Sequence, residues 1–267
     1  MKLAIVKLSA LGDIVHAMIA LQFIKKHYQE ALIDWVVEEG FDGILENNPH
    51  INQIHRVNLK VVKQSSSITL LWRELRKVRK FGRYDLVIDM QGLIKSALVA
   101  RMIPSVITLG FEKTSLKEGM AAIFYNKTYK IDYAENIIER NLALVAYALK
   151  FSIEKENIYH KQPFLYSSQD YSFISISKTK HNIVLIPGAS YKSKCYPVEK
   201  MAELTTQIDA NFLITWGDQK EKIMAEEIKT VFRYDAGGRG FRKAATLLIG
   251  LASILVVFGV FWIKSWL

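Results

Sequence analysis

Asp13 is the first residue whose type and position could do chemistry, because it lies where an apolar, strand-like run changes to helical spacing. The run covers residues 3–8, and Ser9-Ala10-Leu11-Gly12 joins it to the carboxylate. In a parallel α/β sheet such a turn lies at the carboxyl end of the strand, where open sheets bind ligands. Asp13 would then face the ligand crevice. The alternative is that Asp13 only caps the following helix, since aspartate suits an N-cap and the positive end of the helix dipole.

His16 follows Asp13 by three residues and so shares its helical face. A lone pair at this spacing is more typical of a capped helix end than of a metal site, and we predict no metal ligand here. The phosphate-loop, GxGxxG, HExxH and GxSxG motifs are absent from the chain. Cys195 is the only cysteine, which excludes an intrachain disulfide and a cysteine-cluster metal site and fits a reducing compartment.

A second polar turn reads Ser190-Tyr191-Lys192-Ser193-Lys194 and precedes a helix whose start is marked by Pro197. Hydroxyls, a lysine and the free amides of a helix start can together bind a phosphate group. Farther along, Glu221 could accept hydrogen bonds from a ribose. The alternatives are a polar surface loop for the turn and a first-turn helical position for Glu221.

Strand-like runs alternate with amphipathic stretches through the first part of the chain, which indicates βαβ units and a mostly parallel sheet. The predicted strands cover residues 3–8, 32–37, 53–57, 86–90 and 106–109, and the predicted helices cover 14–27, 43–47, 70–81, 93–102 and 134–149. We therefore expect an α/β fold with a complete Rossmann-like domain over residues 1–150. A polar, serine-rich linker follows over residues 151–180.

A second, partial Rossmann-like domain is predicted over residues 181–232. It has strands at 183–186 and 211–216 and helices at 198–208 and 221–229. Two strands and two helices bury too little apolar surface to stand alone comfortably, so this unit needs support from the first domain or a membrane.

The end of the chain is unusually apolar. After a glycine- and arginine-rich hinge over residues 233–243, residues 244–263 carry no charge and are long enough to cross a bilayer as a helix. Basic residues before this run, together with Trp262 and Trp266, predict a transmembrane helix with the N-terminal body in the cytoplasm. A buried core helix is the alternative. The start of the chain lacks a signal-peptide pattern.

The chain is basic, with a net charge of +10 over 267 residues. Residues 231–267 hold five basic residues and one acidic residue, so the rest of the chain still carries +6. Residues 56–83 hold nine Lys or Arg against Glu74 alone. Such a stretch could attract nucleic acid, anionic lipid or an acidic substrate, or it could be a solvated helix face. Nucleic acid is least favoured, because only Trp72 and Phe81 interleave the charges.

Six segments in order carry a family resemblance. They are KLSALGDIVH (7–16), YDLVIDMQGLIKSALVA (84–100), GFEKTSLKEGMAAIFYNKTY (110–129), ENIIERNLALVAYAL (135–149), IPGASYKSKCYPVEKMAEL (186–204) and WGDQKEKIMAEEI (216–228). Together they resemble glycosyltransferase family nine, in its lipopolysaccharide heptosyltransferase I branch, over roughly residues 1–230. The resemblance implies the two-domain GT-B fold. It also implies inverting transfer of L-glycero-D-manno-heptose from ADP-heptose to the Kdo sugar of Kdo2-lipid A, with no essential metal and no cofactor.

The resemblance also implies roles for individual residues. Asp13 matches the proposed general base, which takes the proton from the acceptor hydroxyl. Ser190 and Lys194 match positions near the donor diphosphate, and Glu221 matches one near the ribose. The acceptor side would draw on Gln91, Lys95, Lys113 and Lys117. The implied partners are ADP-heptose, Kdo2-lipid A and the bacterial inner membrane, at its cytoplasmic face.

The chain departs from the family after residue 230. The family continues with further βα units and an Asp-Thr-Gly-x-x-His segment that helps to bind the donor, whereas here VFRYDAGGRGFRK leads into the apolar run. We therefore expect a donor domain that is cut short and joined to a membrane helix. A second hypothesis is a catalytically inactive, membrane-tethered module that binds an anionic glycolipid or a partner.

Overall fold

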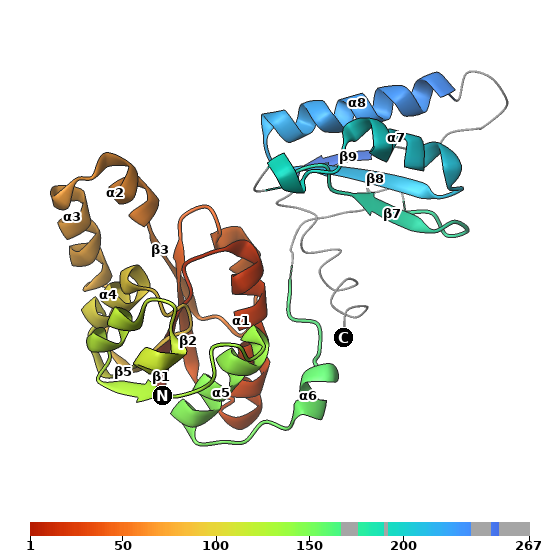
Figure 1. The fold of residues 1–267 in the computed structure, drawn as a ribbon. Coiled ribbons are helices and arrows are strands. Elements are labelled where there is room, and N and C mark those ends of the chain that lie inside the picture. Colours follow the sequence, from red (N-terminus) through yellow and green to blue (C-terminus); the bar gives the residue numbers. More distant parts are fainter. Residues whose placement is uncertain (167–175, 190–191, 236–246, 251–267) are drawn as a thin grey trace. The chain divides into compact units, whose positions relative to one another are not determined.

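A computed structural model describes residues 1–166, 176–189, 192–235 and 247–250 (Figure 1). The chain divides into two compact units between Ser167 and Ser168. Each unit contains its own parallel β-sheet. The α/β fold with two Rossmann-like units that the sequence predicts is therefore present in the described residues.

The first unit is built on a six-stranded sheet in the order β3-β2-β1-β4-β5-β6, with every pairing parallel. The strands are β1 (Lys2–Val6), β2 (Leu32–Glu38), β3 (Gln53–Val57), β4 (Tyr84–Asp89), β5 (Ser105–Phe111) and β6 (Lys127–Tyr129). The central strand β1 is almost entirely apolar and is buried from Leu3 to Val6, as expected of a parallel strand covered on both faces. β6 is a short edge strand that the sequence pattern did not reveal.

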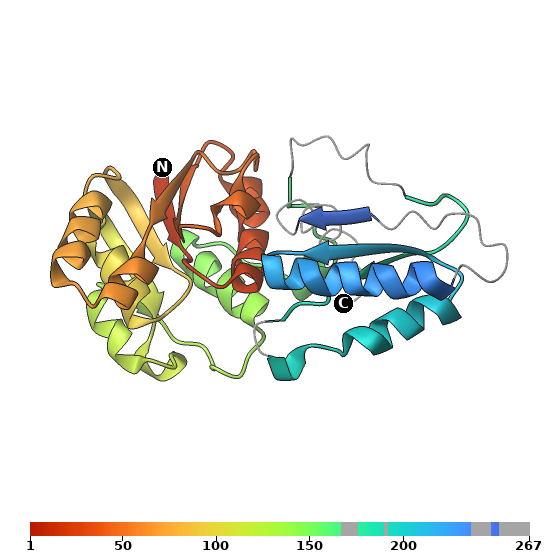
Figure 2. The ribbon, with the colours of Figure 1, turned by 90° about the horizontal axis from the view of Figure 1, so that it is seen from above.

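Helices cover both faces of this sheet (Figures 1 and 2). The first face holds α1 (Leu11–His27) and α5 (Ile137–Leu149), which pack together, and the other holds α3 (Ile68–Val78) and α4 (Ile94–Met102). The shorter helical segments are α2 (Leu59–Ser65), α6 (Lys155–Tyr159) and the 3-10 turns η1 (Asp42–Leu45), η2 (Lys113–Ser115) and η3 (Gly119–Phe124). The predicted helix over residues 43–47 is thus only the 3-10 turn η1.

The helix predicted over residues 70–81 is α3, which begins at Ile68 and ends at Val78, and a separate helix, α2, precedes it. Ser66, at φ 48°, takes the left-handed conformation that ends α2. The Ser67 side chain then accepts a hydrogen bond from the Leu70 amide and so caps α3. The serine run at 65–67 therefore acts as a helix stop followed by a helix start.

The first unit also includes residues beyond 150, the position near which the sequence places the end of the first domain. Phe164 and Leu165 are buried, and the Asn48 side chain donates to the Phe164 carbonyl at 3.1 Å. The Gln22 side chain accepts from the Gln162 amide at 2.9 Å. Residues 151–166, predicted as a linker, are therefore attached to the first unit.

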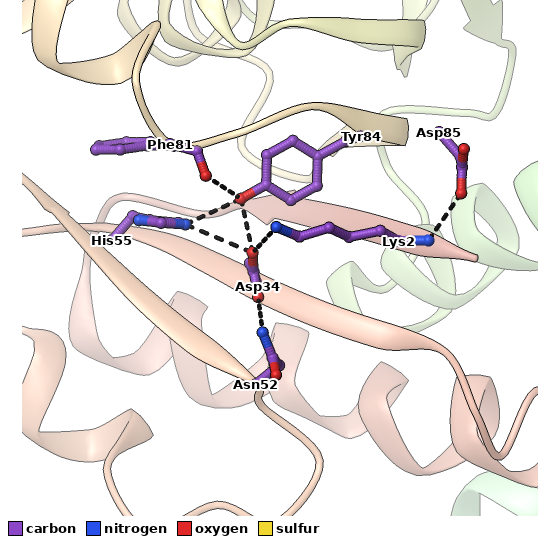
Figure 3. A network of polar contacts seen from close by, with 7 residues as sticks. All are labelled: Lys2, Asp34, Asn52, His55, Phe81, Tyr84 and Asp85. Carbon is purple, nitrogen blue, oxygen red and sulfur yellow. Dashed lines mark hydrogen bonds and ion pairs between the residues drawn. The ribbon is translucent and has the colours of Figure 1, made fainter.

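A buried polar network joins four strands of the first sheet (Figure 3). The Asp34 carboxylate on β2 accepts from Tyr84 Oη at 2.7 Å and from Asn52 Nδ2 at 2.8 Å. It also lies 3.2 Å from Lys2 Nζ and 3.5 Å from His55 Nε2. Burial alone would raise the pKa of Asp34, but these donors outweigh it and hold the pKa well below its usual range.

The second unit has a three-stranded parallel sheet in the order β7-β8-β9, from β7 (Asn182–Leu185), β8 (Asn211–Trp216) and β9 (Leu247–Gly250). α7 (Val198–Gln207) and α8 (Gln219–Asp235) cover one face, and the 3-10 turn η4 (Lys192–Lys194) precedes α7 (Figures 1 and 2). Ala202, Phe212, Ile214, Ala225 and Ile228 form much of the core between them.

β9 corrects the interpretation of the apolar run at residues 244–263. The sequence predicted one transmembrane helix, but residues 247–250 are a strand paired with β8. A short apolar run fits a buried parallel strand as well as a helix, so hydrophobicity alone does not distinguish them. The rest of the run, and residues 236–243 of the predicted hinge, lie outside the described residues. Within the part that the structure describes, every helix is too short or too polar to span a membrane.

Candidate active site

The candidate site of the first unit lies at the carboxyl ends of β1, β4 and β5, which are neighbours in the sheet. Asp13 follows β1, Gln91 and Lys95 follow β4, and Lys113 and Lys117 follow β5. Because parallel strands end at the same edge, the fold brings these segments to one side of the unit, where open α/β sheets bind ligands.

Asp13 occupies the third position of α1, and Ala10 is the N-cap residue. Asp13 Oδ2 accepts a hydrogen bond from the Ala10 amide at 3.2 Å, so the side chain does stabilise the helix start. The side chain is nevertheless exposed, and among the described residues Oδ1 has no hydrogen-bond partner. The two interpretations of Asp13 are therefore compatible, since one oxygen caps the helix while the other is free to meet a ligand.

Gln91 holds the backbone that precedes Asp13. Its Oε1 accepts from the Leu8 and Ser9 amides at 2.7 and 3.2 Å, and its Nε2 donates to Ser9 Oγ at 3.3 Å. Lys95 Nζ reaches the same hydroxyl at 3.5 Å. Gln91 was predicted on the acceptor side, but its side-chain amide positions the β1–α1 turn. Lys95 has an exposed ammonium group beside this turn.

The buried Asp89 side chain fixes the turn that follows β4. Its buried carboxylate accepts from the Gln91 and Gly92 amides at 2.8 and 3.2 Å, and from Ser96 Oγ and Tyr125 Oη at 2.8 Å each. Burial raises the pKa of Asp89, and the four donors oppose that rise. The arrangement fixes Gln91 and, through it, the turn that carries Asp13.

Lys7 is a buried lysine under the same turn. Its Nζ donates to the Met90 carbonyl at 3.1 Å. Burial lowers the pKa of Lys7, whereas attraction to the carboxylates of Asp13 and Asp89 opposes this shift. Burial likewise lowers the pKa of His16, whose Nδ1 is buried without a hydrogen-bond partner in the described structure. Lys7 is thus a buried basic group that the carboxylates of Asp13 and Asp89 attract.

Lys113 and Lys117 are exposed on the loop after β5. Arg140 of α5 is buried beneath this loop, and its Nη2 donates to the Ser115 carbonyl at 2.5 Å. Glu118 accepts from the first amide of α4 at 2.8 Å. The loop thus contacts two helices, while the Lys113 and Lys117 side chains remain exposed.

The second unit has a corresponding edge at the carboxyl ends of β7 and β8. Lys194 is exposed in η4 after β7, and Glu221 lies in the first turn of α8 after β8. Glu221 Oε2 accepts from the Gly217 amide at 2.6 Å. A Cβ at Gly188 would collide with the Glu221 carboxylate, so the two loops touch at this point. Ser190 lies outside the described residues.

Sequence reasoning missed the buried supports of this site. Lys7, Asp89 and Arg140 were not singled out, although a lysine within an apolar strand and an aspartate at a strand end are visible signals. In the part of the chain that is described, no group of three His, Cys, Asp or Glu side chains is arranged to hold a metal ion.

Comparison with known proteins identifies the family to which this chain is similar. The sequence model of glycosyltransferase family 9 (heptosyltransferase) matches residues 68–255. The chain is 39% identical over 238 residues to lipopolysaccharide heptosyltransferase 1 of Campylobacter coli, covering 85% of this chain and 68% of the relative. It is 27% identical over 270 aligned residues to the enzyme of the same name from Pseudomonas aeruginosa, covering 96% and 70%.

Solved structures show the same fold. The E. coli heptosyltransferase WaaC with ADP superposes with a TM-score of 0.75 at 23% identity, covering 97% of this chain and 78% of that one. A glycosyltransferase family 9 structure from Veillonella parvula gives 0.66 at 16% identity, covering 93% and 69%. The predicted GT-B fold is thus confirmed.

The family match also extends beyond residue 230, where sequence analysis ended the resemblance, and includes β9. A family match over most of the chain, a relative at 39% identity and the shared fold lead to one conclusion: this chain is a member of glycosyltransferase family 9, the heptosyltransferases.

Proposed function

We propose that the chain transfers L-glycero-D-manno-heptose from ADP-heptose to the Kdo sugar of Kdo2-lipid A during lipopolysaccharide core synthesis, with inversion at the anomeric carbon. Two relatives are named lipopolysaccharide heptosyltransferase 1, and related structures are titled with ADP and with ADP-2-deoxy-2-fluoro heptose. The observation that carries the assignment is the exposed Asp13 carboxylate, with one oxygen unoccupied, at the ligand-binding edge of the first sheet.

In this mechanism Asp13 is the general base. Its free oxygen takes the proton of the acceptor hydroxyl while that hydroxyl oxygen attacks the anomeric carbon of the heptose. The bond between this carbon and the diphosphate oxygen breaks, and ADP leaves with the electron pair. Proton removal of this kind contributes roughly 100-fold to 10,000-fold to a rate.

The acceptor side is supplied by the exposed ammonium groups of Lys95, Lys113 and Lys117 at the same edge. Kdo2-lipid A carries carboxylates and phosphates, which such cations attract. Gln91 acts indirectly, by holding the Ser9 backbone through its side-chain amide. Because the lipid part of the acceptor lies in a bilayer, the reaction takes place at the cytoplasmic face of the inner membrane.

The donor side is supplied by the second unit. Lys194, with Ser190, binds the diphosphate and stabilises the charge that develops on the departing ADP. Glu221 accepts hydrogen bonds from the ribose through its carboxylate, whose position is set by the Gly217 amide.

Substitution of Asp13 tests the base assignment in a heptose-transfer assay with purified full chain, ADP-heptose and Kdo2-lipid A. Asp13→Asn keeps an oxygen for the Ala10 amide but cannot take a proton, so kcat should fall at least roughly 100-fold with little change in thermal stability. Asp132→Asn is a matched control, because Asp132 is also exposed and accepts from a nearby amide. Equal activity of Asp13→Asn and wild type would disprove the base role.

ADP binding separates the transferase from the inactive binding module. Calorimetry should detect ADP binding by the wild-type chain and a marked loss of affinity in Lys194→Ala. Binding of Kdo2-lipid A without any ADP binding would favour the inactive module instead.

A further inference from the structure

The outer face of α3 is a part of the first unit to which heptose transfer assigns no role. Leu75 and Val78 face inward and are buried. Ile68 and Trp72 point outward, with 72% and 55% of their surface exposed. A helix with one buried apolar stripe and large apolar side chains on its outer face has a second surface that can bind something.

The same face carries an uncompensated positive charge. Its exposed basic residues, with those of the following turn, are Arg73, Arg76, Lys77, Arg79, Lys80 and Arg83. Glu74 is the only acidic residue of this segment and is buried. Its Oε2 accepts from the Asn58 amide at 3.1 Å and lies 3.7 Å from Lys77 Nζ. Within the described structure no ion pair involves Arg73, Arg76 or Lys80.

Several of these side chains line an open groove along α3, whose lining residues include Trp72, Arg73, Arg76, Lys77, Lys80 and Phe81. The Phe81 ring stacks on the His55 ring at a centroid distance of 4.1 Å, and the Phe81 carbonyl accepts from Tyr84 Oη at 3.1 Å (Figure 3). The buried Asp34 network therefore holds one end of the groove, so the surface is preformed.

We propose that this α3 surface docks on a bilayer containing anionic phospholipids, with the helix lying in the interfacial plane. Lysine and arginine would meet the headgroup phosphates, and Trp72 would enter the headgroup region, as amphipathic helices with basic polar faces do. Nucleic acid fits less well, because stacking on bases needs several aromatic platforms and the groove offers Trp72 and Phe81.

This inference rests on and deepens the proposed function, since it names the surface that brings the enzyme to its lipid-linked acceptor. α3 follows α2, which begins at the carboxyl edge of β3, and that edge is the one that carries Asp13. A bilayer bound along α3 would therefore extend to the edge where the acceptor sugar must arrive.

Vesicle flotation tests the proposal with the purified full chain and with neither substrate present. Vesicles of phosphatidylcholine with phosphatidylglycerol are compared with vesicles of phosphatidylcholine alone. Each basic residue near such a surface contributes roughly 5-fold in affinity, so Arg73→Gln/Arg76→Gln/Lys80→Gln should weaken binding to the anionic vesicles on the order of 100-fold. Binding to neutral vesicles should stay the same, and Trp72→Ala should weaken anionic binding as well.

A matched triple variant, Lys26→Gln/Lys130→Gln/Lys178→Gln, removes the same charge from exposed positions outside α3. Near-wild-type binding of this control, with similar thermal unfolding of all variants, supports the proposal. Equal losses in both triple variants, or wild-type binding that does not depend on phosphatidylglycerol, would overturn it. Because flotation needs no ADP-heptose and no Kdo2-lipid A, a negative result leaves heptose transfer standing, and failure of the Asp13 test leaves the docking surface standing.

Discussion

Substitution of Asp34 by asparagine tests the structural reasoning about the buried network that supports the α3 surface. The variant keeps the shape of the side chain and one oxygen, which can still accept from Asn52. It replaces the second carboxylate oxygen with an uncharged amide group. This oxygen is the one that Lys2, Tyr84 and His55 contact. The donors of three residues then lose a common anionic acceptor.

The expected cost follows from what each donor can do next. Tyr84 can turn its proton to the Phe81 carbonyl at 3.1 Å, and Lys2, with 32% of its side chain exposed, can be solvated by water. These compensations bring the cost to the lower end of the roughly 3–5 kcal/mol lost when a fully buried ion pair is broken. We expect a loss of about 3 kcal/mol of unfolding free energy, made up of hydrogen bonds to a charged group at about 1.5–3 kcal/mol each. The corresponding decrease in Tm is roughly 6–12 °C.

Thermal and urea unfolding, followed by circular dichroism, measures this loss. Glu46→Gln is the control, because it removes an exposed carboxylate paired with Arg56 in the same unit and should cost less than about 1 kcal/mol. A double-mutant cycle with Tyr84→Phe should show a coupling energy above about 0.5 kcal/mol. An Asp34→Asn variant as stable as the Glu46→Gln control would refute the reasoning.

Three other predictions follow from named contacts. The pKa of Asp34 is lower in the folded than in the unfolded chain, so its stabilising contribution is present above about pH 4 and is lost as the pH falls through the folded pKa. The unfolding free energy of the wild type should therefore decrease more steeply than that of Asp34→Asn between about pH 4 and pH 2. Parallel curves for the two proteins would contradict this. Gly110→Ala places a Cβ against the Tyr125 ring and should lower the unfolding free energy by about 1–3 kcal/mol in urea titrations, whereas an unchanged midpoint would show that the ring moves freely. Gly188→Ala would displace the Glu221 carboxylate and should weaken ADP binding roughly tenfold by calorimetry, and wild-type affinity would argue against the ribose contact.

Much of the fold could be predicted from the sequence, because parallel α/β units have local patterns. The apolar runs indicated all of the first five strands within two residues of their observed ends. The helices before β4 were harder to predict, since the separation of α2 from α3 depends on the left-handed backbone of Ser66 and on the cap that the Ser67 side chain forms.

The candidate site was predicted only in part. The family resemblance assigned Lys95, Lys113 and Lys117 to the acceptor side, and the strand order of the structure places them at one edge of the sheet. The hydrogen bonds of the Gln91 side chain with the amides of residues 8 and 9 could not be predicted, because they join positions more than 80 residues apart. The same applies to the donors that gather around Asp34, which come from three other strands and a turn.

The sequence by itself determined where Asp13 stands, since a strand, a turn and a helix start are each written in adjacent residues. Only the tertiary structure decided that residues 247–250 of the apolar run pair with β8, because a run of apolar residues is equally compatible with lipid, with a helical core or with a neighbouring strand. Whether a segment is buried depends on what packs against it, and the sequence of the segment does not specify that packing partner.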